Sequence, residues 1–223
     1  MLANLGLGNI PGNVVLLVEE DMGNVKSVLV QMAVKELLHD VKKIVYISTT
    51  RSQEDVKNHI SISTPDNEKN NFTILGSFNE LNSLLDICKK DLNVPTDANE
   101  MLNPYLSTLL TADVCIIDTF SHLFMEEDTG TIKDILNCFV TRSRENKTTF
   151  LLLSDMGILT DRSERIIRAM ADGIIQFRTE YVGSKINRYI NIPKMPGNPP
   201  FNRMVPFNVT GRSIAIDTRE RVG

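Results

Sequence analysis

The chain has 223 residues, of which 42% are hydrophobic and 23% charged, and its formal net charge is −4. This length can bury a substantial core in a single domain spanning residues 1–223, and the small net charge of mixed sign argues against nucleic acid or an anionic membrane as a partner. The chain has three cysteines, Cys88, Cys115 and Cys138, and they form no CxxC pair, so we expect neither a disulfide framework nor a zinc site. No apolar stretch is long enough to span a bilayer. Both observations favour a cytoplasmic location.

Apolar runs bounded by turn residues recur at the spacing of alternating strands and helices. In chain order we predict a strand at 14–19, a helix at 24–38, a strand at 44–49, a short helix capped by Ser52, a strand at 72–75, a helix at 77–90, a loop at 91–103, a strand at 114–118, a helix at 131–144, a strand at 149–154 and a helix at 161–171. The strand at 114–118 is almost entirely apolar, which is typical of a parallel strand covered on both faces.

The pattern changes after residue 171. Segments 172–180, 185–194 and 212–217 alternate like antiparallel strands, and a Pro- and Gly-rich segment at 195–206 connects the second to the third. The whole order predicts an α/β fold with a mainly parallel central sheet, helices on both faces and antiparallel strands at the C-terminal end.

Residues 20–27, Glu-Asp-Met-Gly-Asn-Val-Lys-Ser, join the first strand to the first helix. A P-loop at this place has the pattern G-x-x-x-x-G-K-[ST], in which backbone N–H groups surround the phosphates, the lysine contacts the terminal phosphates and the hydroxyl holds magnesium. Lys26 and Ser27 match the pattern and Gly23 lies inside it, but Glu20 and Val25 replace its two glycines. By itself the segment also fits an ordinary strand, loop and helix with an exposed lysine.

Several segments in a fixed order carry more information than this loop alone. They are GLGNIPGNVVLLVE, IVYISTT, VCIIDTFSHL, TTFLLLSD, ADGIIQFR and NRYINIPKMPG. Together they resemble the RecA superfamily of ATPases and, within it, the KaiC-like branch. The branch's Gly-rich lead-in is approximated at residues 6–12, its Ala-Asp-Gly strand at 171–173, and its late Lys-Met-Arg-Gly element by Lys-Met-Pro-Gly at 194–197. The resemblance covers almost the whole chain and implies a RecA-like sheet.

The resemblance also implies a site for ATP with magnesium. It assigns nucleotide contacts to Gly23, Asn24, Lys26, Ser27, Asp118, Arg188 and Lys194, with Ser27 and Asp118 also holding the metal ion. Asp118 ends a buried strand, where P-loop NTPases place the acid that orders magnesium. In family hexamers the late basic positions lie near the neighbouring subunit's nucleotide. Arg188 and Lys194 fit equally well as solvated charges on an alternating strand.

No catalytic residue is predicted. The family's catalytic glutamate follows the second strand, where this chain has Ser48-Thr49-Thr50-Arg51. A hydroxyl holds its proton near neutral pH, so Thr50 cannot act as a general base toward water. The histidines His39, His59 and His122 fit no catalytic or metal-binding spacing, and we expect them to be structural or surface residues.

The acidic residues of the loop oppose phosphate binding. A carboxylate of Glu20 or Asp21 about 4 Å from a phosphate charge costs on the order of 4 kcal/mol at an effective dielectric constant of about 20. Val25 adds bulk where the backbone must approach phosphate closely. We therefore expect Glu20 or Asp21 to replace the phosphate oxygens and to neutralise Lys26, so that the loop is ordered without nucleotide.

Our leading hypothesis is a KaiC/RecA-like domain that has lost ATP hydrolysis and tight ATP binding and serves as a regulatory or protein-interaction module. We expect protein partners, among them another RecA/KaiC-like subunit, and a monomer or dimer in place of a nucleotide-dependent hexamer. The alternative is an ATPase or ATP-binding switch in which Lys26, Ser27 and Asp118 hold Mg-ATP. A DNA strand-exchange protein would need basic loops, and the only candidate is the segment from Arg178 onward, whose net charge is +5.

Overall fold

The computed structural model describes residues 12–21, 23–40, 42–60, 71–75, 112–197, 203–211 and 213–216. The predicted helix at 77–90, the predicted loop at 91–103, Cys88 and most of the Gly-rich lead-in lie outside these ranges. None of the helices in the described ranges is both long enough and apolar enough to cross a membrane.

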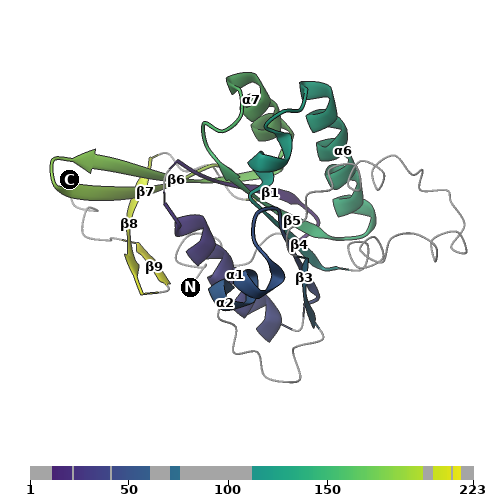
Figure 1. Cartoon of the computed structure of the whole chain (residues 1–223), viewed down its shortest axis with the longest axis horizontal. Helices are drawn as coiled ribbons and strands as arrows, with labels where there is room; N and C mark the ends of the chain where they lie inside the picture. The colour runs from purple at the N-terminus through teal and green to yellow at the C-terminus, as the bar shows by residue number, and fades with distance from the viewer. Residues whose placement is uncertain are drawn as a thin grey trace, which may run out of the picture.

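The described elements follow the predicted order, with the 3-10 helix η3 and strand β8 as additions (Figure 1). They are β1 (Val15–Glu20), α1 (Val25–His39), β2 (Ile44–Ser48), α2 (Gln53–Ile60), β3 (Phe72–Leu75), β4 (Val114–Asp118), the 3-10 helix η3 (Phe120–Phe124), α6 (Thr129–Glu145), β5 (Thr149–Asp155), α7 (Asp161–Met170), β6 (Gly173–Val182), β7 (Lys185–Lys194), β8 (Val205–Thr210) and β9 (Ser213–Ile216).

The strands form one sheet in the order β3-β2-β4-β5-β1-β6-β7-β8-β9. The pairs from β3 through β6 are parallel, and the pairs β6–β7, β7–β8 and β8–β9 are antiparallel. The predicted α/β fold with a mainly parallel sheet and an antiparallel C-terminal end is therefore confirmed.

Helices cover both faces of the sheet, as predicted (Figure 1). Leu16 and Val18 of β1 pack into the same core as α1 and α2, and the β8–β9 pair adds Phe207 and Ile214 to that core. Val15 and Leu17 point to the opposite face, where they join the core formed with η3, α6 and α7. This alternation follows from the two-residue repeat of a strand, and it makes every residue of β1 buried.

Strand β8, which begins at Val205, is not predicted by the sequence pattern and overlaps the end of the connection expected at 195–206. Pro206 in the segment argues against a central strand, but β8 pairs with β7 only at Tyr189 and Ile190 before it turns over the core. Phe207 is buried there against Phe177, with ring centroids 5.5 Å apart. Tertiary packing therefore makes this short strand.

Side-chain caps set where the helices begin. Asp128 accepts hydrogen bonds from the N–H groups of Gly130 and Thr131, at 2.6 and 2.9 Å, so α6 starts two residues before the predicted position. Thr160 accepts from the N–H of Ser163 at the start of α7. The predicted cap Ser52 accepts from the N–H of Asp55 at 3.1 Å.

The Ala-Asp-Gly segment anchors the amino end of the sheet. The carboxylate of Asp172 accepts a 2.8 Å hydrogen bond from the N–H of Val15 and two hydrogen bonds, of 2.9 and 2.6 Å, from the guanidinium of Arg144. At Gly173 any Cβ would lie 2.5 Å from Cδ2 of Leu16, so only glycine fits without repacking. The segment therefore joins β1, α6 and β6 and has a structural role.

Asp172 gives the stability of the fold a pH dependence. Burial alone would raise the pKa of Asp172, but the hydrogen bonds from Arg144 and Val15 and the charges of Arg144 and Lys194 lower it below its usual value of 3.8. The stabilising contribution of the carboxylate is therefore complete above the unfolded-state pKa and is lost as pH falls through the lower folded-state pKa.

We expect Asp172→Asn to lower the free energy of unfolding at neutral pH by about 1 kcal/mol, because the Arg144 partner is half exposed. Urea unfolding should show a constant difference from the parent down to about pH 5 and a shrinking one below about pH 4. Asp134→Asn, at an exposed carboxylate of α6, is the matched control and should change little. A difference that persists unchanged at the lowest pH would contradict this assignment.

Candidate functional site

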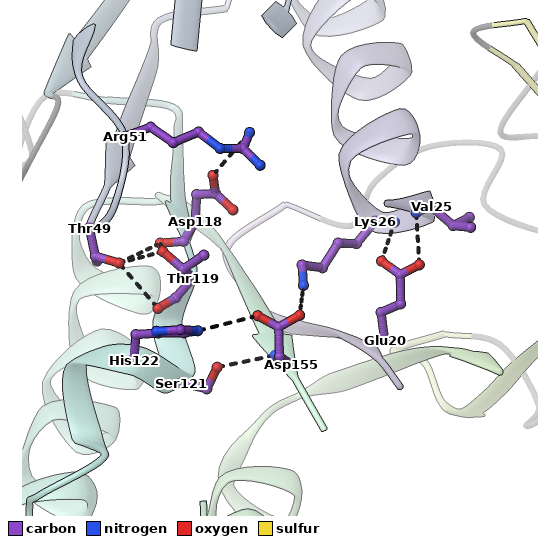
Figure 2. A network of polar contacts seen from close by, with 10 residues as sticks. All are labelled: Glu20, Val25, Lys26, Thr49, Arg51, Asp118, Thr119, Ser121, His122 and Asp155. Carbon is purple, nitrogen blue, oxygen red and sulfur yellow. Dashed lines mark hydrogen bonds and ion pairs between the residues drawn. The ribbon is translucent and has the colours of Figure 1, made fainter. Parts of the chain in front are cut away.

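Three carboxylates lie at the carboxyl edge of the parallel sheet (Figure 2). Glu20 ends β1, Asp118 ends β4 and Asp155 ends β5. Glu20 pairs directly with Asp155 across the β1–β5 ladder. The carboxyl edge is where open α/β sheets place their ligand sites, because the loops that follow the strands gather there.

Glu20 occupies the start of helix α1. Its Oε1 accepts a 2.8 Å hydrogen bond from the N–H of Val25, and its Oε2 accepts a 3.1 Å hydrogen bond from the N–H of Lys26. The residue is 1% exposed. Within the described residues the side chain of Asn24, at the N-cap position, makes no capping bond, so the preceding strand supplies the cap. The free N–H groups and the positive dipole end of a helix favour an anion, and here that anion is a side chain.

Gly23 allows this contact, and Asp21 takes no part in it. Gly23 has φ of +124°, and a Cβ there would lie 2.9 Å from Oε1 of Glu20. Both carboxylate oxygens of Asp21 lie 3.1 Å from the N–H of Thr179 on β6. Successive residues of an extended chain point in opposite directions, so only one of the two carboxylates can face the loop. Of the two carboxylates, Glu20 is therefore the one that binds the first amides of α1.

Lys26 is neutralised by Asp155 and not by a loop carboxylate, which corrects the expectation from the sequence. Its ammonium bonds to Oδ1 of Asp155, and the Lys26 side chain is 7% exposed. Oδ2 of Asp155 lies 3.7 Å from Nε2 of His122, and the N–H of Asp155 donates to the hydroxyl of Ser121 at 3.1 Å. One sequence signal points to Asp155: like Asp118, it is an acid at the carboxyl end of a largely apolar strand.

Asp118 also has partners within the chain. It is 2% exposed, and its Oδ2 accepts a 2.9 Å hydrogen bond from the hydroxyl of Tyr46. Burial, followed by the negative charge of Asp118, raises the pKa of Tyr46 far above its usual range, so this hydroxyl stays protonated and donates. Nη1 of Arg51 lies 3.9 Å from the same carboxylate oxygen, and in the described ranges it makes no hydrogen bond. Tyr46 and Arg51 therefore flank the acid expected to order magnesium.

Two threonines hold the backbone next to Asp118. Thr119 has φ of +55°, which is unusual for a β-branched residue. Its hydroxyl donates to the carbonyl of Asp118 at 2.7 Å and also contacts the hydroxyl of Thr49, the residue after β2. These contacts fix the loop between β4 and η3. Thr50, where the sequence resemblance places the family's catalytic glutamate, is exposed.

The structure brings together part of the predicted site. Gly23, Asn24, Lys26, Ser27 and Asp118 lie at the carboxyl edge, and Ser27 is buried in the first turn of α1. Arg188 lies on β7 and pairs with Thr179 of β6. Thr179 comes two residues after Phe177, which pairs with Glu20 of β1. Lys194 pairs with Ile174 near the amino end of β6, and its ammonium bonds to the carbonyls of Ala169 and Ala171 at the end of α7.

Comparisons with known proteins agree with this architecture. A family model described as the KaiC ATPase matches residues 2–221. The crystal structure of the flagellar accessory protein FlaH from Methanocaldococcus jannaschii is similar to the chain with a TM-score of 0.70 and 19% identity, over 94% of this chain and 92% of FlaH. A KaiC-like protein from Pyrococcus horikoshii has a TM-score of 0.67 and 17% identity over the same shares. At these identities the similarity to both structures establishes the fold alone. No curated protein sequence matches significantly.

Proposed function

Because the chain belongs to the KaiC ATPase family, we propose that it is a member that works without bound nucleotide, as a regulatory or protein-interaction module. The observation that carries the proposal is the position of Glu20. Its carboxylate takes the hydrogen bonds of the Val25 and Lys26 amides, which in a P-loop face phosphate.

The other charged groups of the edge support the same conclusion. A nucleotide with magnesium would offer an anion to Lys26 and a cation to Asp118. In this chain Asp155 provides the anion, while Tyr46 and Arg51 lie against Asp118. As arranged, these residues do not fit Mg-ATP, because phosphate would have to displace Glu20 or lie beside it. A retained carboxylate about 4 Å from one phosphate charge weakens binding by on the order of 4 kcal/mol, or about a thousandfold.

The same contacts give the loop an order that does not depend on a ligand. Both oxygens of Glu20 hold α1, and the Lys26–Asp155 pair joins α1 to β5. A site of this kind presents a constant surface, which suits an interaction module better than a switch that opens and closes with nucleotide. The description of FlaH as a flagellar accessory protein shows that the fold also occurs in a protein named for an accessory role.

A calorimetric titration with Mg-ATP tests the proposal. We expect no saturable heat at millimolar nucleotide, no hydrolysis above a Lys26→Ala control, and no increase in light-scattering mass to six subunits on adding ATP. Saturable binding by the parent, abolished by Lys26→Ala, would refute the proposal. Such binding would favour the alternative, an ATP-binding switch. The observation that supports this alternative is that Lys26, Ser27 and Asp118 lie at the same edge of the sheet.

A further inference from the structure

A shallow groove lies between helices α6 and α7, away from the Glu20 loop. Its volume is about 610 Å³, and it is lined by Lys133 of α6 and by Asp161, Arg162, Arg165, Ile166 and Ala169 of α7. Ile166 and Ala169 provide an apolar surface between three cations and one carboxylate. The groove therefore has the chemistry to hold an apolar side chain flanked by acidic groups.

The cations of the groove have no ionic partner among the described residues. Lys133, Arg162 and Arg165 are exposed, and the ion pairs of the described ranges include none of them. By contrast, Arg168 on the same helix bonds to Glu19 and Glu164. Arg162 also lies in the first turn of α7, where the helix dipole disfavours a positive charge. The stability of α7 therefore gives no reason for a positive charge at this position, whereas an acidic group on a binding partner would.

The loop between η3 and α6 has the complementary chemistry. Met125 is 57% exposed, and it is followed by Glu126, Glu127 and Asp128, all exposed. Asp128 caps α6, but within the described part of the chain the carboxylates of Glu126 and Glu127 form no ion pair. An exposed methionine beside two unpaired acids is an amphipathic docking element, because its flexible thioether adapts to shallow apolar surfaces.

We propose that two copies of this chain associate by placing Met125 of one copy against Ile166 and Ala169 of the other. Glu126 and Glu127 then face the groove cations, and arginine binds a carboxylate through two parallel hydrogen bonds. The proposal goes beyond the nucleotide-free function and does not depend on it, because neither surface includes the Glu20 loop.

A second copy is the occupant that the surfaces favour. The loop directly precedes α6 and the groove lies between α6 and α7, so both belong to the same helical layer on one face of the sheet (Figure 1). A two-fold axis beside this layer would pair each loop with the other copy's groove, giving two equivalent contacts and a closed dimer. A different acidic protein could bind in the groove, but its binding would not account for the exposed Met125 and its neighbouring acids.

Charge reversal in two variants tests the proposal. The groove variant is Arg162→Glu with Arg165→Glu, and the loop variant is Glu126→Arg with Glu127→Arg. In nucleotide-free buffer of low salt, the parent's mass should rise with concentration from that of one chain, 25.0 kDa, toward that of two. Each variant alone should associate about tenfold more weakly or worse, because like charges then face each other. An equimolar mixture should regain association, since both contacts again join opposite charges.

Matched variants control for net charge. Lys57→Glu with Lys185→Glu and Glu54→Arg with Glu180→Arg change the charge by the same amounts at exposed positions on α2 and the β6–β7 hairpin. Their association should equal that of the parent. Any of three results would overturn the proposal. The parent could stay monomeric at every concentration, or the groove and loop variants could associate like the parent. The third is a mixture of the two control variants that gains as much association as the mixture of groove and loop variants.

Discussion

Replacing Glu20 by alanine should lower the free energy of unfolding of the nucleotide-free protein by about 2 to 4 kcal/mol. The change leaves the N–H groups of Val25 and Lys26 without their acceptor at a buried helix start, and each unsatisfied group costs about 1–3 kcal/mol. Water admitted to the vacated space would recover part of the loss. Urea unfolding measures the difference directly.

The same variant should gain a response to anions. With the carboxylate gone, the two amides and the dipole of α1 are open to phosphate. We expect inorganic phosphate or Mg-ATP to stabilise Glu20→Ala in proportion to the logarithm of ligand concentration, by about 2.7 kcal/mol at a hundredfold excess over the dissociation constant. The parent should not respond.

Asp21→Ala is the matched control for this experiment. It removes a neighbouring carboxylate that binds Thr179 on β6, so it should cost stability without opening the loop to phosphate. If Glu20→Ala is as stable as the parent, the hydrogen bonds of Glu20 contribute nothing. If it is destabilised but remains indifferent to millimolar phosphate and Mg-ATP, the loop is not a phosphate site closed by Glu20.

Asp155→Ala should cost a similar amount, about 2 to 4 kcal/mol, because it leaves the buried ammonium of Lys26 without a counter-ion. Breaking a buried pair by removing one partner costs about 3–5 kcal/mol, and the 30% exposure of Asp155 places this pair at the lower end. Lys26→Met should cost less, since the remaining carboxylate can be reached by water. Both values come from urea unfolding at neutral pH.

The double variant Lys26→Met with Asp155→Ala completes a thermodynamic cycle. Removing both charges leaves no uncompensated ion, so the double variant should be more stable than the sum of the single costs predicts, with a coupling of about 1 to 3 kcal/mol. Lys57→Met, at an exposed lysine of α2, controls for the loss of one positive charge. Additive costs would mean that Lys26 and Asp155 do not stabilise each other.

Much of the fold is determined by local patterns in the sequence. The apolar run at 114–118 and the turn residues around it define β4 without reference to the rest of the chain. Ser52 indicates the start of α2 through a contact three residues away. The expected clustering of Lys26 and Asp118 needed only the rule that parallel strands end at one edge. The sequence also limited the carboxylates expected at the start of α1 to Glu20 and Asp21, and the alternation of side chains along the extended chain places Glu20 there and Asp21 against Thr179.

The pairing of charges at the edge was decided by the tertiary structure. Asp155 is 129 positions from Lys26, and the two meet because β5 lies beside β1 in the sheet. Tyr46 reaches Asp118 because β2 lies beside β4, 72 positions later. Strand β8 forms because Phe207 packs on Phe177 across the core. Each contact depends on the order of strands, which nonlocal packing selects, so no window of sequence around Lys26 or Asp118 could identify its partner.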